Sequence, residues 1–243
     1  MIYQQEKEWA KAIAIAEAMP RHTDHLWQKQ ISEFHCELAS NELLHGDAES
    51  VRKHLSLALE ANRKCVRATI LEGDLALQLG DVEGAIETWK RVELQNPVYL
   101  ALVAEKLLDA YLRLGQAEQG AQLLRGYLER HSSLDMLDSA VRAEREIGGL
   151  ESTYQLIRDE LRRNPTLLGL DKLLEAQVHL APPERRADLE LIKNLIHSHT
   201  RRVARYRCDN CGFKARQFYW RCPGCGGWET YPPKRTEEFD LSP

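Results

Sequence analysis

The chain has 243 residues, of which 43% are hydrophobic, and its formal net charge is −4. This is an ordinary soluble composition, and no apolar run approaches the roughly eighteen residues of a membrane-spanning helix. The charge is unevenly spread: residues 1–200 hold 24 basic and 32 acidic side chains, a net of −8, whereas residues 201–221 hold seven basic and one acidic, a net of +6. An acidic body joined to a basic segment indicates an internal contact or an anionic partner.

Residues 1–19 follow a helical pattern with one apolar face. That face is formed by Trp9, Ala12, Ala16 and Met19. Residues 20–24 end this helix, and Asp24 is suited to cap the next one. In the helical-repeat pattern described next, this helix is the second of a pair whose first helix is reduced to a few residues. Because the end of a repeat stack cannot bury its apolar face alone, we expect earlier repeats before residue 1.

Helical patterning continues to about residue 200, and internal repetition appears when the turn glycines are aligned. The turn glycines are Gly46, Gly80, Gly115 and Gly148, with spacings of 34, 35 and 33 residues. About four residues after each glycine begins a helix with its own apolar stripe. A period near 34 with two helices per unit is that of tetratricopeptide repeats. The alternative is a generic helical bundle.

The clearest repeat predicts two helices, at residues 67–79 and 82–94. Within it, Gly73 and Ala85 would let the paired helices approach closely, and Trp89 would fill the space behind them. The other repeats depart further from this pattern.

The last part of the helical region predicts two more helices. One runs from Thr166 to His179, and Pro183 suits the first turn of a long final helix to about Thr200, which would cap the stack. Upstream, Cys36 and Cys65 lie on repeat helices, where a small buried thiol is the common case.

Two C-x-x-C pairs follow the final helix, each with a glycine after it. The four cysteines are Cys208, Cys211, Cys222 and Cys225. This spacing lets each pair turn so that both thiolates face one point, which predicts a single metal ion held by four thiolates. Zinc suits a closed structural site, but thiolates also bind iron, so the spacing leaves the ion open. Disulfides are the alternative, and the chain shows no signal peptide for an oxidising compartment.

The spacer at residues 213–221 is rich in aromatic side chains and is expected to form a strand. The arginines of residues 201–207, beside these aromatics, are a candidate nucleic-acid footprint. We favour the alternative that the aromatics form the core of the module and the arginines meet the acidic repeats. Residues 201–206 contain no Gly, Ser or Pro, so we expect the module to pack on the repeats and not to swing on a linker.

Catalytic motifs are missing from the sequence, including phosphate-binding loops and nucleophile elbows, which indicates a non-enzymatic protein. Repeat stacks expose a concave face, formed by the first helix of each pair, that binds extended or helical protein segments. Charged residues recurring there near the repeat period are the expected partner-binding set. They are Arg67, Asp74, Glu105, Asp109, Arg113, Asp138 and Arg142.

Helical repeats followed by these cysteine motifs resemble the lipopolysaccharide assembly protein B family over essentially the whole chain. The matching residues are Tyr206, Arg207, Cys208, Cys211, Gly212, Phe213, Tyr219, Trp220, Cys222, Pro223, Cys225 and Trp228. The expected fold is an all-α tetratricopeptide-repeat solenoid with a C-terminal capping helix at residues 1–200. It is followed by a small rubredoxin-like or zinc-ribbon-like four-cysteine β module at 201–233 and a polar tail at 234–243.

The resemblance implies an adaptor that regulates lipopolysaccharide synthesis by promoting degradation of the deacetylase LpxC by the membrane protease FtsH. Family members carry an N-terminal membrane helix that this chain lacks. The intact protein is therefore expected at the inner membrane, facing the cytoplasm. The rubredoxin-like label of the family's module points to iron. Two other classes stay open: a nucleic-acid-binding protein using the arginine-rich module, and an iron-dependent electron carrier, for which the cysteine spacer is short.

Overall fold

The structure is a computed structural model that describes residues 2–19, 24–131 and 133–237, without the side chains of residues 24–26, 201–205 and 236–237. The predicted turn at residues 20–23 and the tail from residue 238 lie outside the described residues. The chain divides into two compact units, residues 1–97 and 98–243, and each is described by itself.

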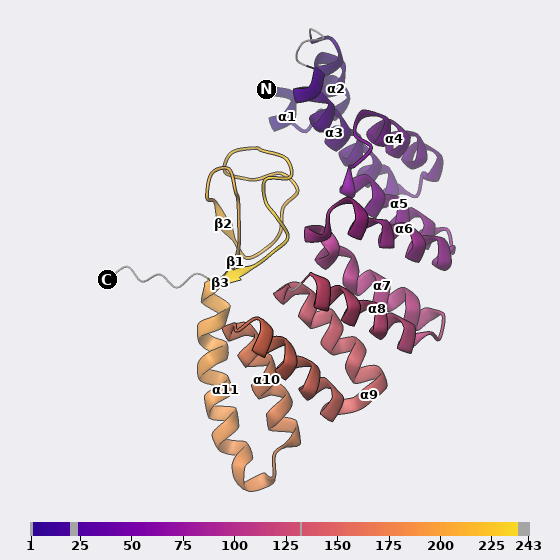
Figure 1. The fold of residues 1–243 in the computed structure, drawn as a ribbon. Coiled ribbons are helices and arrows are strands. Elements are labelled where there is room, and N and C mark those ends of the chain that lie inside the picture. The colour runs from indigo at the N-terminus through magenta and orange to yellow at the C-terminus, as the bar shows by residue number, and fades with distance from the viewer. Residues whose placement is uncertain (1, 20–23, 132, 238–243) are drawn as a thin grey trace. The chain divides into compact units, whose positions relative to one another are not determined.

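Helices account for nearly all of the chain before residue 204 (Figure 1). Unit 1 contains α1 (Ile2–Gln5), α2 (Trp9–Glu17), α3 (Asp24–His45), α4 (Ala48–Ala61), α5 (Val66–Gln78) and α6 (Val82–Gln95). Unit 2 contains α7 (Ala101–Arg113), α8 (Ala117–Arg130), α9 (Leu134–Arg163), α10 (Leu167–Leu180) and α11 (Pro183–Val203), and a 3₁₀ turn at Pro97–Leu100 precedes it. The described residues between 25 and 180 contain no strand, as the repeat pattern predicts.

Three of the predicted turns share one backbone geometry. Gly46, Gly80 and Gly115 have φ of 79°, 86° and 70°, values that a residue with a Cβ rarely adopts. After Gly80, the N–H of Asp81 donates to the carbonyl of Ala76 at 2.9 Å, which is the Schellman closure of a helix end. The Asp81 side chain then caps α6 by accepting from the N–H of Gly84 at 2.9 Å.

The best-matching repeat packs as predicted around Trp89, which is fully buried. The indole N–H of Trp89 donates to the carbonyl of Ile70 at 3.1 Å. A Cβ placed on Gly73 would lie 2.3 Å from Nε1 of Trp89, so only glycine lets α5 approach α6 this closely. The predicted ranges of 67–79 and 82–94 agree with α5 and α6 to within one residue at each end.

The fourth turn lies one residue later than predicted. Gly149, and not Gly148, has the positive φ, at 71°. Gly149 therefore bends the long helix α9 into two halves, which act as the two helices of a repeat. Glu144 is almost fully buried just before this bend, where Arg125 of α8 and the Ser152 hydroxyl both donate to it.

The C-terminal module begins directly where α11 ends, as Figure 1 shows. Its sheet has the order β2-β1-β3, formed by Lys214–Ala215, Ala204–Arg207 and Thr236–Glu237 in antiparallel pairs. The expected strand over 213–221 is reduced to two residues at Lys214–Ala215. Beyond β2, the aromatic residues of this spacer serve the module core, and only Arg221 forms a bridge, with Trp228. Thr236 and Glu237, placed by the sequence in the polar tail, pair with β1.

Within the described ranges, no helix combines the length and the apolar character needed to cross a lipid bilayer.

Candidate metal centre

The two cysteine pairs sit on backbone turns of the same design. The N–H of Gly212 donates to the carbonyl of Cys208, and that of Gly226 to the carbonyl of Cys222, each at 2.9 Å. Both glycines have positive φ, of 75° and 71°, as the C-x-x-C-G pattern requires. The two turns therefore present their four sulfurs to a common point.

The sulfur positions fit one tetrahedral ion. All four Sγ atoms lie within 4.8 Å of one another, and no other comparable group of potential ligands is found among the described residues. The Cys208–Cys225 and Cys211–Cys222 sulfurs are 3.8 and 3.7 Å apart. A metal–sulfur bond of about 2.3 Å in a tetrahedron places sulfurs about 3.8 Å apart. The four predicted ligands are thus brought together in a geometry suited to a metal ion.

Neighbouring polar groups stabilise negative charge on the sulfurs. The amide of Asn210 donates to Cys225 Sγ at 3.4 Å, and this bond lowers the pKa of the Cys225 thiol to about 6. Burial raises the pKa of Cys222 to about 12, so that sulfur needs a cation to be a thiolate at neutral pH. Zinc and iron both supply that charge.

Aromatic rings build the module around the buried half of the site. Cys208 and Cys222 are each 1% exposed, and Tyr231 is fully buried beside them. The rings packed around this centre are Tyr206, Phe213, Phe218 and Tyr219. These aromatics form the module core, as the alternative to a nucleic-acid footprint predicted. The side chains of Arg201, Arg202 and Arg205 lie outside the described set.

The module packs on the repeats of unit 2, as expected from the lack of a flexible linker. Trp220 stacks on Tyr99 with ring centroids 5.3 Å apart and planes 5° apart. A second contact joins Asp135 in the first turn of α9 to Arg235, whose backbone N–H donates to Asp135 Oδ2 at 3.0 Å. Tyr206 also approaches this carboxylate, with its hydroxyl 3.2 Å from Asp135 Oδ1.

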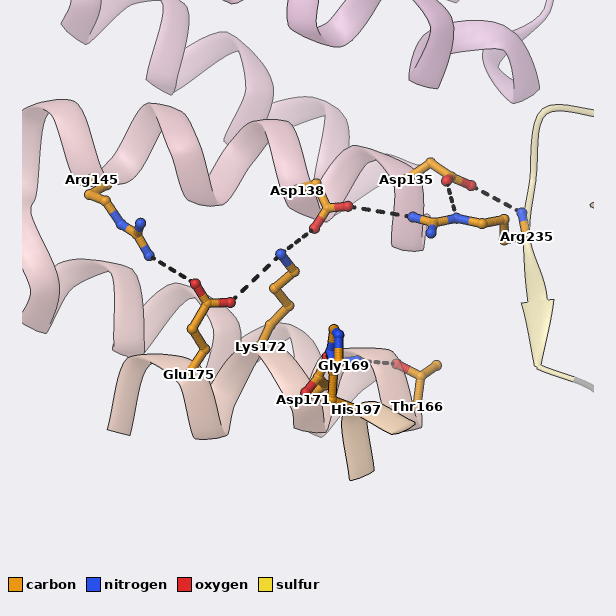
Figure 2. Close-up of polar contacts among 10 residues, drawn as sticks. All are labelled: Asp135, Asp138, Arg145, Thr166, Gly169, Asp171, Lys172, Glu175, His197 and Arg235. Atoms are coloured by element: carbon orange, nitrogen blue, oxygen red, sulfur yellow. Dashed lines mark hydrogen bonds and ion pairs between the residues drawn. The ribbon is translucent and has the colours of Figure 1, made fainter. Parts of the chain in front are cut away.

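Figure 2 shows that this second contact continues as a line of alternating charges into α10. Arg235 pairs with Asp138 at 3.4 Å, Asp138 with Lys172 at 3.1 Å, and Lys172 with Glu175 at 3.9 Å. Arg235 was missed by the sequence reasoning, since its partner Asp135 is 100 residues away and only the fold brings them together.

The charged residues predicted to bind partners fall into different environments. Glu105, Asp138 and Arg142 are exposed on α7 and α9, and Asp109 is partly exposed. Arg142 bridges Glu105 at 3.1 Å and Asp109 at 2.7 Å. These four residues form what we call the α7–α9 charged face.

Three predicted partner-binding residues do not belong to this face: one is buried, and two lie elsewhere on the helices. Arg67 is only 7% exposed and pairs with Glu33 at 3.3 Å and Glu37 at 2.8 Å, both on α3. The expectation that Arg67 lies on an open surface is therefore wrong, because two carboxylates one helical turn apart enclose it. Asp74 is half-buried on α5, and Arg113 is exposed at the end of α7.

Two further groups of side chains, of Cys and of His, make polar contacts elsewhere in the helices. Cys36 and Cys65 are fully buried, as predicted, with their sulfurs 3.7 Å apart. The His197 side chain is half-exposed, and its Nδ1 lies 2.8 Å from Asp171 Oδ2. The group of potential metal ligands found among the described residues includes neither of them.

Comparison with known proteins agrees with the sequence motifs. The sequence profile of a family described as "Rubredoxin metal binding domain" matches residues 206–233. Lipopolysaccharide assembly protein B of Escherichia coli K12 is 29% identical over 238 residues, which cover 96% of this chain and 60% of that protein. The protein of the same name from Haemophilus influenzae Rd is 27% identical, covering 99% of this chain and 61% of its own length. The resemblance is confirmed, and the chain spans about three fifths of the length of these relatives.

Comparison with solved structures gives alignments at low sequence identity. A crystal structure of MamA aligns with a TM-score of 0.46 at 11% identity, over 70% of this chain and 93% of that one. A thermophilic tetratricopeptide-repeat protein of Thermus thermophilus aligns with a TM-score of 0.42 at 17% identity, over 68% and 88%. We draw no conclusion about function from these alignments. The fold class expected from the sequence, helical repeats followed by a four-cysteine zinc-ribbon-like module, is confirmed.

Proposed function

We propose that this protein is a non-enzymatic adaptor in lipopolysaccharide assembly that presents the deacetylase LpxC to the protease FtsH and so promotes its degradation. The assignment to lipopolysaccharide assembly is supported by the name of the relatives, lipopolysaccharide assembly protein B. The partner names follow only from the family that the cysteine motifs resemble. In this proposal, residues 1–200 are the repeat stack and residues 201–233 the metal module. Thr236–Glu237 of the predicted tail at 234–243 join the module through their pairing with β1.

The observation that carries the adaptor proposal is the α7–α9 charged face. Its four residues come from the first helices of successive pairs, which form the ligand-binding side of repeat stacks. Arg142 of α9 pairs with two carboxylates of α7, Glu105 and Asp109. A complementary pattern of charges favours discrimination among protein partners more than it favours affinity.

The four-cysteine centre has a structural role in this proposal. When bound, the metal supplies the cross-link that holds two turns with little core of their own. The module then positions Arg235 against Asp135 and Asp138 beside the charged face. Inner-membrane anchoring of the intact protein, on the cytoplasmic side, is part of the same proposal.

A pull-down with full-length, membrane-anchored protein from a Gram-negative lysate tests the adaptor function. We expect recovery of LpxC and FtsH. We expect a strong loss when two of the predicted partner-binding charges are reversed by Asp109→Arg, on the α7–α9 charged face, with Arg113→Glu, at the end of α7. Glu129→Lys provides a matched control, because Glu129 is exposed on α8, a second helix. Recovery of neither partner with the unaltered protein contradicts the proposal.

A further inference from the structure

A groove of about 740 Å³ lies on unit 1. Its lining comes from α4, the second half of α5 and α6, and both α4 and α6 pack on α5. We call the apolar part of this lining the floor and the charged part the rim. Figure 1 shows these three helices following one another in the chain. The α7–α9 charged face is in the other unit, so the function proposed above leaves this groove without a role.

The floor of the groove is apolar. Leu55 and Leu75 are buried beneath it, and Leu59 and Ala76 are partly exposed. Leu79, at the C-terminal end of α5, is 53% exposed. A cavity of this size is within the range of about 300–1,000 Å³ typical of ligand pockets, so it can hold several large apolar side chains.

The charges on the rim are unequal in their availability. Arg52 on α4 and Arg63 just after its end are exposed and make no ion pair or hydrogen bond within the described part of the chain. The acidic groups of the rim are already engaged: Glu72 with Arg91 at 3.0 Å, Glu60 with the Ser56 hydroxyl at 3.1 Å, and Asp81 with the N–H of Gly84 at 2.9 Å. The groove thus offers a ligand two arginines that have no carboxylate partner among the described residues. Of its three acidic side chains, Glu72 is paired with a cation, and Glu60 and Asp81 keep their charge while accepting hydrogen bonds from neutral groups.

We propose that this groove binds an amphipathic helix of a protein partner, with leucine-like residues on its apolar face and two carboxylates about three turns apart. The spacing follows from α4: Arg52 to Ala61 spans about 14 Å at 1.5 Å per residue, and Arg63 lies two residues further along the chain. Apolar anchors would lie on the leucine floor, and each carboxylate would pair with one arginine. The proposal rests on the adaptor function in assuming protein partners, and it adds a second surface with its own partner chemistry.

An apolar floor between the two arginines distinguishes this ligand from a nucleic acid. A phosphate backbone would place a charge at every nucleotide and would leave the leucines without apolar contacts. A helix that is acidic on its flanks and apolar on one face satisfies both parts of the groove.

The test is fluorescence anisotropy with the complete chain and a labelled helical peptide of about sixteen residues, in which two glutamates about three turns apart flank a face of leucines. We expect saturable binding that weakens about tenfold when both glutamates are replaced by lysine, since two exposed ion pairs are lost. Replacing its leucines by glutamine should abolish binding.

Protein variants locate the site. Arg52→Glu with Arg63→Glu should weaken binding of the glutamate peptide at least tenfold and should improve binding of the lysine peptide. Lys53→Glu is the matched control, because Lys53 is exposed beside Arg52 on α4 but does not line the groove, and it should change affinity less than twofold. Undetectable binding, equal binding of the two peptides, or binding unaffected by the arginine changes overturns the proposal. The assay contains neither LpxC nor FtsH, so its failure is distinguishable from failure of the adaptor function.

Discussion

The helical repeats and the cysteine module are stabilised by different interactions. The repeats of unit 2 bury whole apolar side chains between helices, among them Leu100, Leu107 and Leu124. The module has strands of two to four residues, and two of its three most buried core residues are cysteines of the metal centre. A core of that size cannot offset the conformational entropy of folding, whereas a metal bound by four thiolates can.

The largest effect should come from removing the metal ligands. Replacing Cys222 and Cys225 by serine should abolish metal binding, which is worth on the order of 10–16 kcal/mol in small zinc modules, and should unfold the module. The repeats should remain helical but melt at a lower temperature, because they lose the Trp220 and Arg235 contacts.

Elemental analysis and thermal melting check this prediction. The unaltered protein should carry one ion per chain, and the analysis of protein produced with both metals available identifies zinc or iron. Unchanged melting of the repeats in the double variant would count against packing of the module on unit 2.

A core substitution should show the opposite pattern. Trp89→Ala should lower the free energy of unfolding by about 3–5 kcal/mol, since it leaves a cavity beside Gly73. Metal content should not change. Chemical denaturation measures the effect, and Leu94→Ala is the control on the same helix, because Leu94 is 88% exposed and should matter by less than about 0.5 kcal/mol.

The contact between the two regions should have an intermediate energy. Asp135→Asn and Arg235→Gln, alone and together, form a double-mutant cycle, in which we expect a coupling energy of about 0.5–3 kcal/mol. The same cycle with Asp138 in place of Asp135 should give less, because Asp138 makes only the longer contact, at 3.4 Å. A coupling of zero at Asp135 would show that the aromatic contact alone holds the module.

The smallest effect should be a pH dependence of the free energy of unfolding that arises from His35 in unit 1. The His35 imidazole lies 3.1 Å from that of His54, and burial followed by the charge of His54 lowers the pKa of His35 to about 4. The unfolded chain binds this proton near pH 6.5, so stability is complete above pH 6.5 and falls as the pH drops from 6.5 toward 4. Equilibrium unfolding across this range should show a loss of about 1 kcal/mol in the free energy of unfolding, because solvent screens this partly exposed pair, and His35→Gln should remove that loss.

How much could be predicted from sequence also differs between the two regions. Repeat turns depend on local chemistry, so Gly46, Gly80 and Gly115 identified the helix ends. At the fourth turn two adjacent glycines were equally suitable, and it is Gly149, not Gly148, that has the positive φ. The C-x-x-C-G turns are equally local, and the four ligands follow directly from them.

Features that depend on distant contacts could not be predicted in this way. Arg67 has the charge of a surface residue, and only the arrangement of α3 against α5 encloses it between Glu33 and Glu37. The aromatic spacer has the composition of a strand, yet its rings are used for the module core and for the stack on Tyr99. Sequence composition does not distinguish these uses.

Hydrogen–deuterium exchange measured by mass spectrometry, with and without chelation of the metal, tests the central comparison most directly. Chelation should remove protection from residues 206–233 and weaken it at the first turn of α9, while α5 and α6 keep theirs. One equivalent of metal should restore the original pattern. Protection of residues 206–233 that persists in metal-free protein, or a loss of protection that spreads equally through α5 and α6, would contradict the account.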